Sequence, residues 1–271
     1  METNKLIKSK KNTIYNLASA ALFILLLAVW QFLSQVPKVS FLFGSPTKIF
    51  ASLIKNTLNG ILINDFLITG FEALLGFVIG ITAGTIIGFV LWYSPFVARL
   101  TRPYIIILGA VPIFAFAPMI IVWFGIGIKM KIIMAALGTF LVSLIQSYEG
   151  AKSVNLKEFN LLKTFGASRF QTFQKVIIPS SLNWVLTSIK LNVGFALLGA
   201  FIGEFISAER GLGHFMIKAG ALYDIPGVLA GSIYLVVLAL LLNLIVSLIE
   251  KNKIKIVKLF AVSREVRKFS P

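Results

Sequence analysis

The sequence contains no cysteine and only one histidine, His214. Without thiols the chain can form no disulfide bond, no cysteine nucleophile and no cysteine-based metal site. One imidazole cannot build a histidine-rich metal site either. We therefore expect no bound metal and no thiol chemistry.

Charged residues are scarce as well. Asp, Glu, Lys and Arg make up only 13% of the 271 residues, and the mean hydropathy is +0.91. So few charges cannot cover a soluble globule of this size, which predicts a protein embedded in a lipid bilayer. The net charge of +16 could indicate nucleic-acid binding, but the basic residues occupy short segments between apolar stretches rather than one clustered face. A nucleic-acid partner is not expected.

Catalytic patterns are missing too. The ten acidic residues form no close carboxylate pair, and no Ser, His and Asp arrangement suggests a nucleophile. The phosphate-binding pattern G-x-x-x-x-G-K-[ST] does not occur, so the chain is not expected to hydrolyse ATP through a P-loop. We expect no catalytic residue, and a membrane enzyme is the weakest hypothesis.

What the sequence does contain is long apolar stretches. Six are long enough to cross a bilayer, which predicts an all-α polytopic membrane protein with six transmembrane helices. The first has a basic front like a signal peptide, but its apolar run is long and no cleavage site follows, which favours an anchor. The predicted spans are 14–34, 66–92, 101–124, 131–147, 185–208 and 227–250.

The segments outside the predicted spans lie on two sides of the membrane and differ in their number of Lys and Arg residues. One side has 18, and the other has 7, which include Lys129 and Lys131. The richer side should be cytoplasmic, with both termini. The predicted organisation is a cytoplasmic tail (1–13), the first span (14–34), an extracytoplasmic loop (35–65), a five-helix domain (66–250) with a cytoplasmic elbow (155–179), and a basic cytoplasmic tail (251–271).

The second predicted span has a glycine at every fourth position of one helical face. Such a surface lets another helix approach backbone to backbone. The alternative, a phosphate-binding loop, lacks a preceding strand and the P-loop lysine. We predict a helix-packing ladder that can also support association with a second copy of the chain, formed by Gly76, Gly80, Gly84 and Gly88.

The third predicted span contains Pro112 and Pro118 on either side of Phe114. Each proline removes a backbone donor and bends or interrupts the helix. In a membrane, such a break is tolerated where protein or a water-filled cavity covers it. The pattern therefore indicates either a packing kink or the lining of a translocation path, and both can hold together.

Three ionisable residues, Glu72, Lys190 and Glu204, fall within predicted spans. Such residues are costly in hydrocarbon and usually face protein or an aqueous cavity. For Lys190 we favour snorkelling to the cytoplasmic surface, and for Glu204 a structural hydrogen bond. Glu72 and Glu204 are also candidates for a translocation path, or for the ion sites of an ion-coupled carrier or channel.

A polar, helix-prone stretch, "NLLKTFGASRFQTFQKVIIP", separates the fourth and fifth spans. In the segment 156–179 that contains it, Phe159, Phe165 and Phe170 are among the spaced apolar residues and Gly166 interrupts the pattern, which predicts two short helices. Pro179 marks entry to the fifth span. Spacing alone also fits an amphipathic hairpin lying on the membrane.

This stretch resembles the cytoplasmic loop signature of bacterial ABC importer permeases, EAA-x3-G-x9-[IV]-x-[LI]-P, with Gly166, Val176, Ile178 and Pro179 in register. The similarity extends over "SPTKIFASL", "VPIFAFAPMIIVWFGIG", "YEGAKSV" and "GEFISAERGLG" to the nitrate/sulfonate/taurine-type branch. It implies the type I importer permease fold in the bacterial inner membrane. It also implies a homodimer, two ABC ATPase subunits that hold ATP and Mg, no cofactor in this chain, and an extracytoplasmic substrate-binding protein.

In this family the elbow docks on the ATPase, and the resemblance carries that role to Asn160, Leu161, Leu162, Gly166, Ala167, Ser168, Val176 and Pro179. The chain departs from the pattern at one place. Asn160, Leu161 and Leu162 stand where the family has Glu-Ala-Ala, so the contact with the ATPase should differ in detail. The resemblance implies a small anion, a sulfonate or a small vitamin precursor as substrate.

Overall fold

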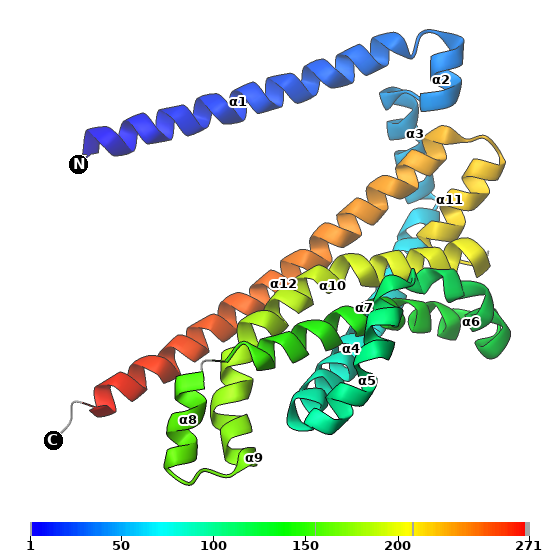
Figure 1. Cartoon of the computed structure of the whole chain (residues 1–271). Coiled ribbons are helices and arrows are strands. Elements are labelled where there is room, and N and C mark those ends of the chain that lie inside the picture. Colours follow the sequence, from blue (N-terminus) through cyan, green and yellow to red (C-terminus); the bar gives the residue numbers. More distant parts are fainter. Residues whose placement is uncertain (1, 155, 208, 269–271) are drawn as a thin grey trace.

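The computed structural model describes residues 2–154, 156–207 and 209–268, and its regular elements are all helices. Figure 1 shows the long helices packed side by side, with shorter helices at the two ends of the bundle. The elements are α1 Glu2–Leu33, α2 Pro37–Phe43, α3 Pro46–Leu58, α4 Ile61–Tyr93, α5 Pro95–Ala110, η1 Ile113–Phe116, α6 Ala117–Phe124, α7 Ile128–Lys152, α8 Leu156–Thr164, α9 Arg169–Thr172, η2 Phe173–Ile177, α10 Ile178–Ser207, α11 Leu212–Ala221 and α12 Ile225–Lys268.

Five of the described helices are long and apolar enough to cross a membrane, and a bent pair raises the number to six. The bent pair is α5 with η1 and α6, which meet at 86°. The third span is therefore not one helix over 101–124, as predicted, but two segments. The break follows Ala110, where Val111 and Pro112 have extended backbone and Pro112 cannot donate a helical hydrogen bond.

The glycine ladder is confirmed as a helix-packing surface, and its partner is α7 of the same chain. A Cβ added at Gly84 would lie 2.8 Å from Ser143 Cβ, and one at Gly88 would lie 2.9 Å from Ser147 Cβ. Gly76 and Gly80 meet Ala135 and Thr139 in the same way. Because this chain itself covers the ladder, the expectation that the ladder supports association with a second copy is wrong.

The helix α7 is held from its other side by α10. Gly199 of α10 lies against the α7 backbone, where an added Cβ would be 2.6 Å from Ala135 Cα. Gly150 of α7 faces Trp184 of α10 in a similar approach, at 2.6 Å from its Cβ. Small residues thus allow close contact of α7 with both α4 and α10. In a bilayer there is no hydrophobic driving force for helix association, so the dispersion forces of this close packing stabilise the bundle.

Several predicted boundaries need correction. The segment 35–65, predicted as an extracytoplasmic loop, is mostly helical, because α2 and α3 occupy most of it and α4 already begins at Ile61. Each of these two short helices begins at a proline, which suits the first helical position, and Ser45 caps α3 by accepting from Lys48 N at 3.4 Å. The helix α11 between the fifth and sixth spans was not predicted.

The predicted tails are continuous with their spans. The helix α1 already begins at Glu2, and α12 continues to Lys268, so residues 1–13 and 251–271 are helical wherever the structure describes them. The helix α1 projects away from the bundle and meets it only near its C-terminal end (Figure 1). None of its apolar window, within Tyr15–Leu33, is buried inside this chain.

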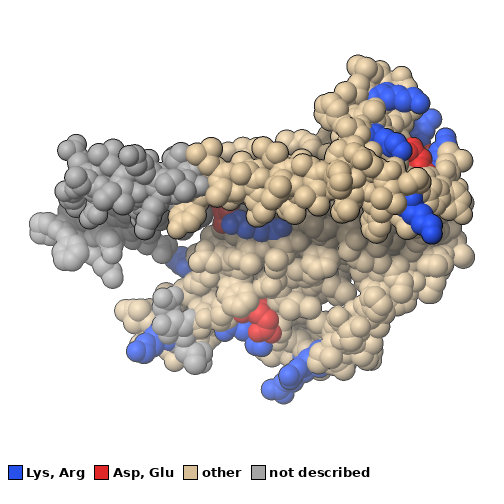
Figure 2. All heavy atoms as spheres, turned by 90° about the horizontal axis from the view of Figure 1, so that it is seen from above, with Lys and Arg blue, Asp and Glu red and all other residues tan. Residues whose placement is uncertain are grey.

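The surface agrees with a protein surrounded by lipid. Figure 2 shows a face that is mostly tan, with Lys and Arg in small separate groups. Many large apolar side chains are exposed on the spans, including Val122 at 82% and Leu240 at 64%. In water such a surface would aggregate, but in a bilayer it contacts acyl chains.

Candidate functional site

The elbow turns at Gly166, as predicted. The helix α8 ends at Thr164, and Gly166 has φ +72°, a left-handed conformation that favours glycine. Ala167 N donates to Leu162 O at 3.0 Å across the turn. The next helix starts with a capping box, in which Gln171 N donates to Ser168 Oγ at 3.2 Å and Ser168 N donates to Gln171 Oε1 at 2.9 Å.

The elbow presents apolar side chains to its surroundings. Leu161 is 57% exposed, Phe165 77% and Phe170 56%, while Leu162 is half-buried. Asn160, Ser168 and Pro179 are exposed, and Ala167 and Val176 are half-buried. Exposed apolar groups at a bundle end that also carries polar residues are suited to a protein partner.

The second short helix of the elbow is the beginning of the fifth span. The helices α9, η2 and α10 form one continuous helical segment from Arg169 to Ser207. Its only irregularity is the π-helical turn Phe173–Ile177, so Pro179 lies inside the helix rather than at a separate entry point. The second half of the elbow and α10 are therefore one helical element.

Phe173 also joins the elbow to α4. Its ring centroid lies 5.6 Å from that of Trp92, in a stacked arrangement, and 5.7 Å and 5.9 Å from those of Phe89 and Tyr93, in edge-to-face arrangements. The Arg169 guanidinium lies over the Tyr93 ring at 5.2 Å. We refer to Phe89, Trp92, Tyr93 and Phe173 as the aromatic cluster; it was not predicted, because Phe173 is 80 or more residues from the other three in sequence.

At the opposite end of the bundle, a buried ion pair connects α4 to α7. Lys131 Nζ lies 3.3 Å from Glu72 Oε1, and the two side chains are only 2% and 1% exposed. Lys131 Nζ also donates to Arg210 O at 2.9 Å. Counting Lys131 among the loop charges was wrong, because its side chain is buried in the bundle and paired with Glu72; without it, the poorer side has 6 basic residues.

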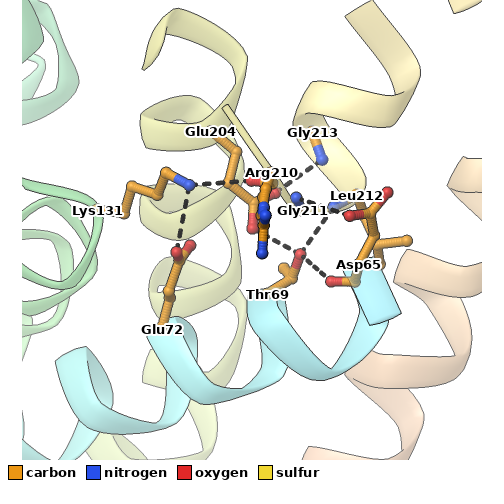
Figure 3. A network of polar contacts seen from close by, with 9 residues as sticks. All are labelled: Asp65, Thr69, Glu72, Lys131, Glu204, Arg210, Gly211, Leu212 and Gly213. Atoms are coloured by element: carbon orange, nitrogen blue, oxygen red, sulfur yellow. Dashed lines mark hydrogen bonds and ion pairs between the residues drawn. The ribbon is translucent and has the colours of Figure 1, made fainter. Parts of the chain in front are cut away.

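Glu204 is the centre of a second part of the same network (Figure 3). Its carboxylate accepts from Thr69 Oγ1 at 2.6 Å and from Gly213 N at 2.7 Å, and the side chain is completely buried. Thr69 Oγ1 in turn accepts from Leu212 N at 2.9 Å. This arrangement fits the predicted structural hydrogen bond of Glu204, and it attaches the start of α11 to α4 and α10.

Asp65 completes the network from the first turns of α4. Its Oδ1 accepts from Gly211 N at 3.1 Å. Gly211 has φ +107°, and a Cβ there would collide with the Glu204 carboxylate, so both conformation and space require glycine. We define the polar clamp as Asp65, Thr69, Glu72, Lys131 and Glu204 with the backbone of 210–213.

The sequence analysis missed Asp65, Thr69 and Lys131. A signal was present, because positions 65, 69, 72 and 76 follow helical spacing on the face that continues into the glycine ladder. All four positions are buried. Lys131 carries no comparable signal, since a lysine near a span end is indistinguishable from a loop lysine until its partner is known.

A third buried polar group lies between α7 and α10. Asn192 Nδ2 donates to Ser143 Oγ at 2.7 Å and to Ser188 Oγ at 3.0 Å, and all three side chains are completely buried. Hydrogen bonds of this kind hold membrane helices together where no water competes. Lys190, predicted to snorkel, is half-exposed and forms an ion pair with Glu250 of α12 at 2.6 Å.

The candidate path residues of the third span have different surroundings. Pro112 and Pro118 are exposed at the break and at the start of α6. The Phe114 ring is partly buried against α7, where a Cβ at Gly138 would lie 3.0 Å from it. Phe114 thus anchors the broken segment to the bundle, and the two prolines remain open to a partner, a solute or lipid.

The buried carboxylates do not resemble ion sites. Glu72 is paired with Lys131, and Glu204 accepts two hydrogen bonds, so binding an ion would require breaking the polar clamp. Among the residues that the structure describes, no group of three or more His, Cys, Asp or Glu could hold a metal ion. The geometry therefore favours a structural role over ion coupling.

Apolar spans held together by small residues, with an elbow between the fourth and fifth, define a polytopic membrane permease. The chain belongs to the family of binding-protein-dependent transport system inner membrane components, whose sequence pattern matches residues 76–255. The predicted resemblance to ABC importer permeases of the nitrate/sulfonate/taurine type is confirmed.

Two relatives and one solved structure illustrate this membership. The formylaminopyrimidine transport permease protein ThiX of Halalkalibacterium halodurans is 28% identical over 85% of this chain and 92% of its own. The taurine transport system permease protein TauC of Escherichia coli is 33% identical over 59% of this chain and 58% of its own. The fold is similar to a chain of the inward-facing MetNI methionine ABC transporter, with TM-score 0.64 and 16% identity over 72% of this chain and 97% of that chain.

Proposed function

We propose that this chain is the permease subunit of an ATP-driven importer and forms the translocation path as a homodimer. Its elbow, residues 155–179, docks on two separate ABC ATPase subunits, which hold ATP and Mg. The chain itself performs no chemistry. Closure of the ATPase pair moves the elbow, the spans switch from inward-open to outward-open, and hydrolysis resets them.

The proposed homodimer is supported by the number and arrangement of the spans. Six spans are few to enclose a path for a solute, and three of them, α4, α7 and α10, pack closely on one another. The helix α1 stands apart, with none of its apolar window buried against its own bundle. A second copy in cyclic symmetry would provide the opposite wall of the path.

The proposed orientation places the elbow and both termini in the bacterial cytoplasm. It rests on the excess of Lys and Arg, 18 against 6 after the correction for Lys131. The ends of α2, α3 and α11 then face outward, where an extracytoplasmic substrate-binding protein delivers the solute. Pro112 and Pro118 are the proposed contacts of the path.

The substrate class follows from the relatives and remains broad. ThiX is named for a formylaminopyrimidine and TauC for taurine, which is a sulfonate. We propose a small anion or sulfonate, or a small precursor of a vitamin, as the solute. In such importers the binding protein supplies much of the selectivity, so ligand identification on that partner is the direct test.

The observation that carries the proposal is the mechanical connection of the elbow. The elbow exposes apolar side chains before and after Gly166, and it is joined to α10 by a continuous helix and to α4 by the aromatic cluster. A hairpin that merely lay on the membrane would need neither connection. A force applied at the elbow therefore reaches two of the three close-packed spans.

The experiment compares two valine substitutions at glycines of the same conformation. Gly166 and Gly60 have φ of +72° and +73°, and an added Cβ would meet nothing within 4 Å at either site. Valine should therefore cost a similar 1 kcal/mol or so of backbone strain at both. We expect Gly166→Val, and separately Leu162→Asp, to leave the permease inserted but to weaken ATPase co-purification and abolish substrate-stimulated hydrolysis.

Gly60→Val is the matched control, because Gly60 lies between α3 and α4, away from the elbow. It should keep ATPase binding and transport. The proposal fails if Leu162→Asp detaches the elbow from lipid while ATPase binding and transport stay normal. The proposal also fails if Gly60→Val and Gly166→Val have the same effect on ATPase co-purification and on substrate-stimulated hydrolysis.

A further inference from the structure

A groove opens between the third span and the fourth at the elbow end of the bundle. The helix α5 packs on α4 and leaves a space of about 590 Å³ against the second half of α7. Leu91 and Leu144 are buried or nearly so in its floor, and Ile105, Ile106 and Ile145 form much of its sides. The groove is thus an apolar channel along the surface of the bundle.

The charge in this groove lies in its half nearer the elbow. Arg99 and Arg102 are in the first half of α5, and Lys152 is the last residue of α7. In the part of the chain that the structure describes, neither arginine has a carboxylate partner. The only acidic residue of the lining, Glu149, is engaged by Lys152 at 3.1 Å, so an excess of positive charge remains.

The apolar part of the groove continues along α5 beyond the arginines. It runs from Arg102 past Ile105 and Ile106 to Gly109, which at 1.5 Å per residue is about 10 Å. This is most of the depth of one leaflet, about 15 Å in a ~30 Å hydrocarbon core. At the far end, a Cβ at Gly109 would meet no atom within 4 Å, so the groove stays open there.

We propose that this groove binds an anionic phospholipid, whose phosphate lies at Arg99 and Arg102 and whose acyl chain lies along Ile106, Gly109 and Ile145. Basic pockets between membrane helices on the cytoplasmic side are suited to acidic headgroups. A small soluble anion would match the arginines but would leave the apolar length uncovered. The site does not depend on which substrate is transported; its leaflet is the cytoplasmic one in the orientation proposed above.

The test measures lipid retained by the intact permease. The full chain is reconstituted with phosphatidylcholine and increasing phosphatidylglycerol, extracted, and analysed by native mass spectrometry. We expect one phosphatidylglycerol per chain to be retained in preference to phosphatidylcholine. Loss of two arginine contacts in Arg99→Gln/Arg102→Gln should reduce that preference by roughly thirty-fold.

Two further variants separate the headgroup from the acyl chain. Lys175→Gln removes an exposed positive charge at the same end of the bundle but outside the groove, and it should leave the preference unchanged. Gly109→Trp fills the apolar end and should lower retention of phosphatidylglycerol while Arg99 and Arg102 remain. Neither change touches the close-packed helices, so folding should be preserved, and thermal unfolding of each variant checks this.

Three results would overturn the proposal. The first is equal retention of the two lipids by the unchanged protein. The second is displacement of phosphatidylglycerol by inorganic phosphate or a short alkanesulfonate at the same ionic strength, which would identify a soluble anion as the ligand. The third is efficient crosslinking from Ile106→Cys to a second copy, which would mean that another chain covers the groove.

Discussion

Lys131 of α7 lies 3.3 Å from Glu72 of α4, and the two side chains are almost completely removed from solvent. Together with Glu204 they form the core of the polar clamp at the end of the bundle opposite the elbow. A buried pair of this kind contributes little net stability, but each partner depends strongly on the other. The mutual dependence of Lys131 and Glu72 therefore predicts how single and double substitutions of the pair will differ.

Single substitutions in this pair should be far more damaging than the double one. Glu72→Gln or Lys131→Gln leaves one buried charge without its partner, at a cost of about 3–5 kcal/mol. Glu72→Gln/Lys131→Gln removes both charges and should recover much of that loss. Thermal unfolding of the detergent-purified protein, analysed as a double-mutant cycle, measures the coupling; additive effects would show that the pair does not interact.

The glycine ladder predicts that even one methyl group is not tolerated. In Gly84→Ala the new Cβ would lie 2.8 Å from Ser143 Cβ and closer still to Phe140 O, so α4 and α7 must separate. Gly84→Leu should prevent folding or assembly altogether. Yield of monodisperse protein and its thermal unfolding are the measurements.

The control for the ladder is the same change at Gly194, a glycine of α10 whose added Cβ would meet nothing within 4 Å. Gly194→Ala should be neutral, or stabilising by up to about 1 kcal/mol through helix propensity. Ile86→Leu, on a residue that is 57% exposed, should also have little effect. If Gly84→Leu assembles and transports normally, α4 does not pack on α7 through this face.

The aromatic cluster predicts a variant that separates binding from coupling. Phe173→Ala removes three ring contacts, each worth about 0.5–1.5 kcal/mol beyond area burial, and so frees the elbow from α4. The exposed face of the elbow is unchanged. We therefore expect the ATPase subunits to co-purify, while their hydrolysis no longer responds to the loaded binding protein.

Phe96→Ala is the control for this variant, because Phe96 lies at the start of α5, is 77% exposed and belongs to no ring contact of the cluster. With Phe96→Ala, ATP hydrolysis by the ATPase subunits should respond normally to the loaded binding protein. Normal coupling in Phe173→Ala would mean that the continuous α9–α10 helix alone carries the movement.

The proposed orientation can be tested without a background signal, since the chain has no cysteine. Ser168→Cys places a thiol on the exposed elbow, and it should resist membrane-impermeant reagents added to intact cells. Tyr223→Cys, on an exposed residue at the opposite end, should react from outside. If Ser168→Cys reacted from outside and Tyr223→Cys did not, the orientation would be the opposite of the one proposed.

Much of this architecture follows from local properties of the chain. The apolar stretches, the glycine repeat and the glycine at 166 are local signals that can be recognised within one segment. They correctly predicted the long helices, the packing surface of α4 and the turn of the elbow. The predicted boundaries were less accurate. Capping at Pro37, Ser45 and Pro46 was overlooked in a segment assigned as a loop. The apolar run 101–124 was predicted as one span bent or interrupted at its prolines, and the size of the break, 86°, did not follow from the sequence.

The sequence by itself determined that the protein is a helical membrane protein with an elbow at its fourth connection, because hydrophobicity and glycine spacing are properties of each segment alone. Its resemblance to the loop signature of ABC importer permeases then indicated the family. Only the tertiary structure decided what each surface contacts. It placed α7 against the glycine ladder, paired Lys131 with Glu72, and brought Phe173 to Trp92 across 81 positions of sequence. Such pairings depend on how whole helices pack in three dimensions, and buried charges or rings take their roles from partners that no local pattern specifies.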